Sequence, residues 1–379
     1  VEVRKAPLQE RIDSKKTAYD TQISGFGALK SSLSDLNAVV APLKDPDLFN
    51  AKALNVPTTD VITTNSISAS ALAGTYQVEV TQIATAQSLA INSSATAKDE
   101  ALNKSGNLTF KFGTWTYGAN PTAPPAEIPS SLAVNADKPA FTIAVATDDS
   151  LEDIAKKIND SKGGVQASVL EISGQFQLLL TADSGADNAI EITTDTPASL
   201  SEFEFKASVD NSNITETQRG GDSKLKLNGL EITRESNNIT DVIQGLDFTL
   251  NKTDVGNPIT FSITQDKSIA EQAVRDLVTA YNLFFETASN LTGVKTDENN
   301  QLIKGDLATD GTAKDVLSRI RQAISGTADG LKVSDEFSSL THVGIRTKQD
   351  GSLEIIEADF KAGFDDNFEK LSRLFATDL

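Results

Sequence analysis

The sequence contains no cysteine and no methionine. Without cysteine there can be no disulfide, no thiol nucleophile and no cysteine-ligated metal. The missing initiator methionine predicts that Val1 begins a fragment or a processed form. The end at Leu379, directly after the apolar-periodic stretch NFEKLSRLF, predicts a cut at that end too.

Positive charge is also scarce, with 34 Lys and Arg against 53 Asp and Glu and a net charge of −19 at pH 7. Such a chain repels phosphate backbones and anionic lipid, so we expect no nucleic-acid partner and no membrane partner. No apolar run approaches the ~20 residues of a membrane span, and the N-terminus shows no signal-peptide pattern. With 379 residues, 39% hydrophobic and 6% aromatic, the composition favours two to four domains over one large core.

The clearest periodicity lies at the N-terminus, where apolar residues recur mostly every three or four positions over residues 8–43. This spacing predicts a long amphipathic helix with a narrow, coiled-coil-like seam. Pro42 and Pro46 bracket its end. Gly25 and Gly27 weaken the middle by ~1 kcal/mol each and permit a kink or a close helix contact.

The C-terminal third shows the same period. A second long helix begins near Ser268, and a third is predicted around residues 316–324. A small hairpin with Asp350-Gly351 at its turn follows, and then the helical stretches ADFKAGF and NFEKLSRLF. The predicted leg-helix seam consists of Leu8, Ile12, Tyr19, Ile23, Phe26, Leu29, Leu33, Leu36, Ile269, Ala273, Leu277, Tyr281, Phe284 and Leu291.

Between the long helices the pattern is that of β-strands. TYQVEVTQI and PITFSIT alternate apolar and polar residues. In LKLNGLEITRESNNITDVIQGLDFTL, Asn228-Gly229 predicts a tight hairpin turn. Asn238 or Thr240 is expected to cap one helical turn through Ile243, and Gly245 to end it before a third strand.

The central module FTIAV to AIEI predicts a strand, a short helix and three strands. Ser150 and Asp153 form a variant of the capping box at the start of the helix, and Gly163-Gly164 end it.

The order of these segments predicts nesting, because helices at both chain ends can bury their seams only against each other. The expected fold class is a multidomain α+β protein with a helical, coiled-coil-like leg domain and two nested β-rich head domains. The expected domains are residues 1–50 with 266–379 (leg), 51–96 with 205–265 (inner β-rich) and 97–204 (outer β-rich).

Catalytic patterns are absent from the sequence. His342 is the only histidine, and no G-x-S-x-G elbow accompanies it. Asp148-Asp149 and Asp365-Asp366 precede helices, where acidic residues serve as caps. The loop DSGADN lacks the EF-hand spacing, since the twelfth residue from Asp183 is Thr194. No phosphate-binding glycine motif occurs. We therefore expect no enzyme, no metal and no cofactor.

Trp115 and Tyr117 leave two alternatives open. As neighbouring aromatic residues of FKFGTWTYGAN they are candidates for an exposed aromatic patch that contacts sugar or protein. As alternating strand residues they also fit core or edge packing.

Several stretches, taken in order along nearly the whole chain, resemble the flagellar filament-capping protein family, also called hook-associated protein type 2. ISGFGALKSSLSDL with DPDLFNAKA resembles its N-terminal helix, and GTYQVEVTQIATAQSL its first β motif. SLEDIAKKINDSKGG through AIEI is similar to a module of flagellin- and hook-related proteins. NNITDVIQGLDFTL, ITFSITQD, VTAYNLF and VGIRTKQDGSLEI resemble the C-terminal half. The family's terminal segments are missing here.

The resemblance implies a structural and assembly function at the extracellular tip of the bacterial flagellum. Such proteins leave the cell through the flagellar export apparatus, without a cleaved Sec signal peptide. They form a homo-oligomeric ring, pentameric or near it, which promotes folding and insertion of flagellin. Implied partners are the protein itself, flagellin, hook-filament junction proteins and, through the missing termini, the export apparatus and a chaperone.

Two other functions remain open at this stage. One is another axial flagellar component, flagellin-like or a hook-junction protein. The other is an extracellular glycan-binding adhesin that uses the outer domain for cell adhesion.

Overall fold

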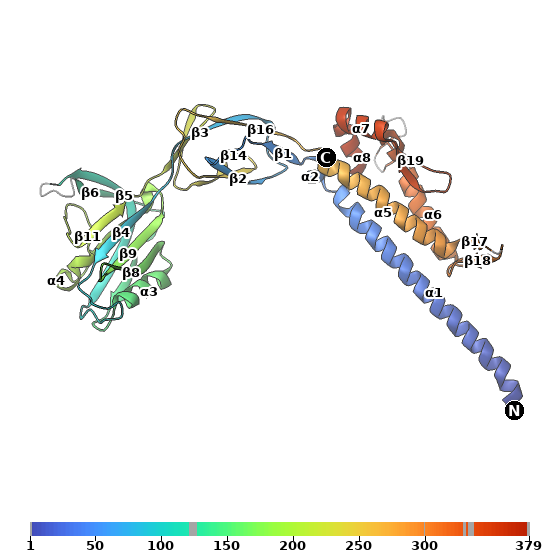
Figure 1. Cartoon of the computed structure of the whole chain (residues 1–379), viewed down its shortest axis with the longest axis horizontal. Coiled ribbons are helices and arrows are strands. Elements are labelled where there is room, and N and C mark those ends of the chain that lie inside the picture. The colour runs from blue at the N-terminus through green and yellow to red at the C-terminus, as the bar shows by residue number, and fades with distance from the viewer. Residues whose placement is uncertain (1, 121–126, 299, 329–330, 333–336, 377–379) are drawn as a thin grey trace. The chain divides into compact units, whose positions relative to one another are not determined.

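The computed structural model describes residues 2–120, 127–298, 300–328, 331–332 and 337–376. The chain divides into two compact units, which we call unit 1 (residues 1–53 and 264–379) and unit 2 (residues 54–263). Figure 1 shows both units coloured along the chain. The expected α+β multidomain class, with helices from both chain ends and β-rich parts between them, is confirmed.

Unit 1 is mainly helical. Its helices are α1 (Glu2–Leu43), α2 (Pro46–Phe49), α5 (Ser268–Thr292), α6 (Gly311–Ser325), the 3₁₀ turn η3 (Leu340–Val343), α7 (Glu357–Asp366) and α8 (Phe368–Phe375). Two small hairpins complete it, namely β17 (Val294–Thr296) with β18 (Leu302–Lys304) and β19 (Ile345–Thr347) with β20 (Leu353–Ile355).

Helices α1 and α5 lie side by side and antiparallel. Pro42 of α1 shares a groove with Ile269, at the start of α5, whereas Ser32 shares one with Leu283, further along it. The chain turns between α1 and α2, where the Asp45 carboxylate accepts a hydrogen bond of 3.0 Å from the Asp47 amide. The core of unit 1 lies between these helices and the C-terminal elements.

Polar contacts join α5 to the C-terminal elements. The Asn282 side chain exchanges two hydrogen bonds with the main chain of Leu353, at 2.7 and 3.0 Å. The buried Tyr281 hydroxyl donates to the Gly351 carbonyl at 3.1 Å. Because these bonds connect residues about 70 positions apart, they fix the tail hairpin on one face of α5.

Unit 2 contains two hydrophobic cores, which we call the inner and the outer core. The inner core has a five-stranded sheet of order β1-β16-β3-β12-β13 and a three-stranded sheet of order β14-β15-β2. Their bounds are β1 (Lys52–Asn55), β2 (Ile62–Ile67), β3 (Gly74–Gln82), β12 (Ser223–Leu227), β13 (Leu230–Arg234), β14 (Asn238–Ile243), β15 (Leu246–Leu250) and β16 (Ile259–Gln265).

The Asn228-Gly229 turn is confirmed. The two residues have φ of 49° and 85°, and they connect β12 to β13 in register. The expected helical turn through Ile243 is wrong, because residues 238–243 form strand β14. This segment pairs with β15, and its β-branched Ile239 and Ile243 are buried in the inner core, so tertiary pairing overrides the local cap signal.

The outer core has sheets of order β11-β4-β9-β8 and β10-β5-β6, with β7 also paired to β5. Their bounds are β4 (Ala86–Asn92), β5 (Gly106–Ala119), β6 (Glu127–Val134), β7 (Phe141–Val145), β8 (Val165–Ile172), β9 (Gln175–Ser184), β10 (Ala189–Thr194) and β11 (Ile214–Gln218). Helices α3 (Leu151–Ser161) and α4 (Pro197–Leu200) and the 3₁₀ turns η1 (Ala186–Asn188) and η2 (Ser201–Phe203) complete this part.

Helix α3 begins as the sequence predicts. The Ser150 hydroxyl accepts a hydrogen bond from the Asp153 amide at 3.2 Å, and the Asp153 carboxylate accepts one from the Ser150 amide at 3.0 Å. Its apolar residues, among them Ile154 and Ile158, are buried in the outer core.

The predicted borders of the outer domain are too narrow. Strands β4 and β11 lie outside residues 97–204, yet they form a sheet with β8 and β9. Leu89 and Ile91 of β4 belong to the outer core. Alternation within one strand does not reveal which sheet the strand joins, so its partners could not be read from the pattern.

Candidate functional site

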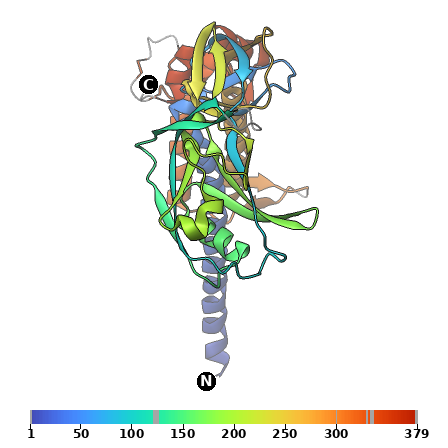
Figure 2. The ribbon, with the colours of Figure 1, turned by 90° about the vertical axis from the view of Figure 1, so that its left-hand side faces the viewer.

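The first half of α1 carries an apolar stripe that no other described part of unit 1 covers. Leu8 is 59% exposed, Tyr19 62% and Ile23 69%. None of residues 7–24 is buried, and burial begins at Gly25, whose Cα faces the Leu307 side chain. Figure 1 shows this end of α1 extending past the end of α5, and the turned view in Figure 2 also shows it without a neighbour from unit 1.

The predicted packing of the leg-helix seam is therefore wrong for part of its length. Helix α1 has 42 residues and α5 has 25, which correspond to about 63 Å and 38 Å at 1.5 Å per residue. Helix α5 therefore ends before it reaches the N-terminal part of the apolar stripe on α1. The seam residues left exposed on α1 are Leu8, Ile12, Tyr19, Ile23 and Phe26.

The rest of the α1 seam contacts the core of unit 1. Leu29 and Leu36 are buried, and Leu33 is partly buried against them.

On α5 the buried face is rotated from the predicted one. Ala270, Val274 and Val278 are buried, whereas Ile269 is 48% exposed. Apolar residues line two sides of this helix, and the spacing of one row does not show which side faces the core. Of the predicted seam residues on α5, Leu277, Tyr281 and Phe284 are buried, and Ala273 and Leu291 are partly buried.

The second apolar side of α5 forms a groove with α1. Two adjoining hollows of about 640 and 320 Å³ share Val39 and Asp276 as lining residues, so they form one continuous groove. Its lining is mainly apolar, with two carboxylates. We call the following set the α1/α5 groove: Ser32, Asp35, Val39, Pro42, Leu48, Ser268, Ile269, Gln272, Ala273, Asp276, Thr279, Ala280, Leu283 and Phe284.

The predicted seam does not include this groove. The signal was present, because Ile269, Ala273, Ala280 and Leu283 recur at steps of four, seven and three, which is a second helical row. The charge of Asp276 in the middle of that row concealed it.

The predicted exposed aromatic patch is wrong for Trp115, which is only 7% exposed. Its indole N–H donates to the Ile190 carbonyl at 3.0 Å, and its ring meets Phe205 edge to face at 5.7 Å. An aromatic ring is buried here because β5 turns that face toward the outer core.

Tyr117 is half-buried and already has partners. Its hydroxyl donates to the Glu216 carboxylate at 2.6 Å, and the Arg219 guanidinium lies 3.6 Å from its ring centre. Burial, and then the Glu216 carboxylate, raises the pKa of Tyr117. Arg219 thus covers one face of the Tyr117 ring.

A pocket of about 480 Å³ lies beside these residues. Arg219 lines it and forms ion pairs with Glu127 at 3.0 Å and Glu216 at 3.4 Å. Its cation is thus neutralised within the wall of the pocket.

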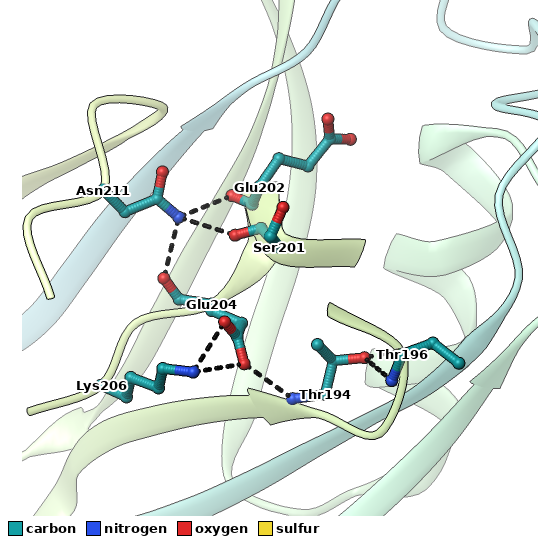
Figure 3. Close-up of polar contacts among 7 residues, drawn as sticks. All are labelled: Thr194, Thr196, Ser201, Glu202, Glu204, Lys206 and Asn211. Atoms are coloured by element: carbon teal, nitrogen blue, oxygen red, sulfur yellow. Dashed lines mark hydrogen bonds and ion pairs between the residues drawn. The ribbon is translucent and has the colours of Figure 1, made fainter. Parts of the chain in front are cut away.

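Asn211 lines this pocket and belongs to the polar network in Figure 3. The Asn211 side-chain amide donates to the carbonyls of Ser201, Glu202 and Glu204 at 2.9, 3.2 and 2.9 Å. The buried Glu204 carboxylate binds the Lys206 ammonium at 2.8 and 2.9 Å. The Asn211 amide and the Lys206 ammonium thus both have acceptors, which is typical of side chains that stabilise a loop and not of a reactive site.

The other candidates are also engaged in structural contacts. His342 lies in η3, where its Nδ1 is 3.3 Å from the Ser338 amide and 3.3 Å from the Ser339 hydroxyl. Asp183 binds Lys138 at 2.7 Å. Asp149 accepts from the Ala146 amide at 2.7 Å beside α3.

Within the described part of the chain, no group of three or more His, Cys, Asp and Glu is placed to hold a metal ion. None of the helices described is both long and apolar enough to cross a membrane.

The fold and its surfaces define a multidomain α+β protein whose uncovered helical stripe and groove are suited to contacts with other proteins. Comparison with known families agrees with this class. Residues 1–87 match the N-terminus and residues 220–379 the C-terminus of flagellar hook-associated protein 2, and residues 131–184 match the flagellin hook IN motif. The chain belongs to the flagellar hook-associated protein 2 family.

Relatives match along most of the chain. The A-type flagellar hook-associated protein 2 of Pseudomonas aeruginosa is 27% identical over 399 residues, covering 100% of this chain and 77% of its own length. Flagellar hook-associated protein 2 of Escherichia coli K12 is 29% identical, covering 91% of this chain and 69% of its own. The crystal structure of the D1-D2-D3 domains of the Escherichia coli flagellar cap protein FliD has a TM-score of 0.74 at 27% identity, covering 92% of this chain and 89% of that one.

Proposed function

We propose that this protein caps the tip of the bacterial flagellar filament and promotes the folding and insertion of exported flagellin, working as a ring of identical subunits. The observation that carries the proposal is the match to the Escherichia coli flagellar cap protein over 92% of the chain, at a TM-score of 0.74. It covers both the helical ends and the β-rich cores, and therefore the whole architecture rather than one shared module.

The surfaces described above support an assembly role. An exposed apolar stripe on a helix is a typical contact site for a partner helix. A filament subunit that folds against the cap supplies its own free energy, so the cap needs no catalytic residues and no cofactor. On this proposal the protein is not an enzyme.

The proposed location is outside the cell at the flagellar tip, reached through the flagellar export channel without a cleaved signal peptide. The composition is compatible with that route. A chain with no cysteine passes through a narrow channel unfolded without forming cross-links on the way.

We also propose that the chain works as three domains. The helical leg domain is formed by both chain ends. The inner and outer β-rich domains, each built on a core of its own, provide the ring surface. The partners proposed are other copies of the chain, flagellin and the junction proteins below the filament.

Complementation tests the proposal. The full-length gene, expressed in a non-motile strain that lacks its cap protein, is expected to restore swimming and long filaments. The control is the same strain with the empty vector, which secretes flagellin as monomer. Monomeric flagellin in the medium despite good expression of the full-length protein would contradict the proposal. Fibres formed by the full-length protein alone would instead identify another axial component.

A further inference from the structure

We infer that the exposed stripe of α1 in one copy docks into the α1/α5 groove of a second copy. The stripe is defined here as Leu8, Ile12, Lys15, Tyr19 and Ile23. The inference rests on the proposed self-association of the cap, and it names the surfaces through which two copies meet.

The groove has the form of a site for a third helix. Two antiparallel helices present a continuous hollow between them, lined by Val39 and Pro42 from α1 and by Ile269, Ala273 and Leu283 from α5. A helix that lays an apolar face into such a hollow makes a three-helix contact, with knobs from the incoming helix between side chains of the other two.

The stripe has the periodicity that such a contact needs. Leu8, Ile12, Tyr19 and Ile23 follow one another at steps of four, seven and four, and Lys15 occupies the position between Ile12 and Tyr19. All five side chains are exposed. Covering large apolar side chains such as these is favourable by ~25 cal/mol per Å² of apolar surface removed from water.

The two surfaces match in length. Leu8 to Ile23 spans fifteen residue steps and Ile269 to Leu283 spans fourteen. At 1.5 Å per step these are about 22 Å and about 21 Å. The stripe therefore fills the groove along α5 without an overhang.

They also match in charge, and at the same place. Lys15 lies seven residues after Leu8 and eight before Ile23, while Asp276 lies seven after Ile269 and seven before Leu283. Each apolar row thus has one charge at its centre, positive on the stripe and negative in the groove. No ion pair of Lys15 or Asp276 occurs among the described residues, and the Asp276 carboxylate accepts only from the Gln272 side chain of its own helix at 2.8 Å.

For the stripe to fill this groove, the two surfaces have to come from different molecules. The stripe and the groove residue Val39 lie on one continuous helix. Leu8 is 31 steps from Val39, or about 46 Å along the axis, so the stripe does not reach the groove of its own chain. A contact between two different surfaces of identical subunits is heterologous, and such contacts close into rings when the rotation allows it.

Cysteine cross-linking tests this contact, because residues 1–379 contribute no native cysteine that would compete with the introduced pair. The full-length protein with Lys15→Cys and Asp276→Cys is oxidised and run on a non-reducing gel. We expect covalent dimers and a ladder of higher species, because each copy carries both halves of the contact. A mixture of the two single variants is expected to stop at the dimer.

The matched control is Thr17→Cys with Asp276→Cys. Thr17 is exposed at nearly the same height on α1, but two residues further on the helix its side chain points away from the stripe. Cross-linking of the control as efficient as that of the Lys15 variant would overturn the inference.

Charge reversal is a second, independent test. Lys15→Glu or Asp276→Lys alone is expected to raise the dissociation constant of the self-association roughly tenfold, measured by sedimentation velocity at low salt. The double variant with both changes is expected to recover most of the lost affinity. Both positions are exposed, so the far-ultraviolet circular dichroism stays unchanged. Single variants that associate like the wild type would overturn the inference.

The outcomes also separate this inference from the proposed function. A wild type that stays monomeric at every concentration would remove both the proposed ring and this contact. A wild type that self-associates while the Lys15/Asp276 cysteine pair does not cross-link above the control would remove this contact alone. Restored motility in the complementation assay would then still support the cap.

Discussion

At the scale of single residues, Arg275 joins two helices of unit 1. Its guanidinium binds the Glu357 carboxylate of α7 through two hydrogen bonds of 2.7 Å and the Glu271 carboxylate of α5 at 2.9 and 3.1 Å. It also lies 4.6 Å from the ring centre of Phe360. One planar cation thereby joins α5 to α7, a geometry that lysine does not reproduce.

The Arg275–Glu357 pair predicts a dependence of stability on pH. Hydrogen bonding to Arg275 holds the pKa of Glu357 below its ordinary value. A carboxylate with a lowered folded-state pKa stabilises the fold above its unfolded-state value of ~4.3, and this contribution is lost as the pH falls through the folded-state value. Glu357→Gln is therefore expected to lower the urea midpoint at pH 7, and the difference from the wild type is expected to be smaller at pH 3.

The control for this experiment is Glu286→Gln, which makes the same change at an exposed position of α5. No ion pair of Glu286 occurs among the described residues. It should leave the midpoint unchanged at both pH values. A Glu357→Gln variant that is equally destabilised at pH 7 and pH 3 would contradict the role of the charge.

At the scale of elements, the two glycines of α1 have different neighbours. A Cβ at Gly27 would have no other atom within 4 Å, whereas a Cβ at Gly25 would lie 3.1 Å from Cγ of Leu307 and 3.3 Å from Cβ of Asp306. Gly27 thus lowers the stability of the helix without a packing reason. Gly25 lets the segment after β18 approach the helix closely.

Gly27→Ala is expected to stabilise unit 1 by about 0.5–1 kcal/mol, because alanine has the higher helix propensity and restricts the unfolded chain. The measurement is urea unfolding followed by circular dichroism at 222 nm. Gly25→Ala serves as the matched comparison. It is expected to gain less or to destabilise, since the Leu307 side chain has to move. Equal stabilisation by both variants would show that the Leu307 contact has no cost.

Local patterns predicted these elements well where the local signal is strong. The α3 capping box and the Asn228-Gly229 turn depend on residues within a few positions of one another, and both are confirmed. The predictions are wrong where contacts with distant residues determine the structure. Residues 238–243 pair as a strand, and Ile269 faces outward because the core lies on the other side of α5. Helix α1 extends beyond the end of α5, so its first half stays exposed.

At the scale of the whole molecule, the cores of the two units share no residue. Most helical residues belong to unit 1, whereas Trp115, the only tryptophan, is buried in the outer core of unit 2. Far-ultraviolet circular dichroism therefore reports mainly on unit 1, and tryptophan fluorescence reports on unit 2. Comparing these two signals therefore shows whether units 1 and 2 unfold together.

We expect the two urea transitions to have different midpoints. Leu180→Ala supplies the control, because it leaves a cavity in the outer core and is expected to cost unit 2 about 2–5 kcal/mol. The fluorescence midpoint is expected to fall while the transition at 222 nm stays in place. Coincident transitions in the wild type, or a shift at 222 nm in Leu180→Ala, would show instead that the units unfold as one.

The uncovered half of α1 has a thermodynamic consequence. A helical segment without tertiary contacts has only its intrinsic propensity to hold it, and in water that is marginal over this length. Any partner that covers Leu8 to Ile23 therefore also supplies the support that this half lacks. Recognition and helix formation at this end of the chain are one coupled equilibrium, so the concentration of the partner sets how much of the helix is formed.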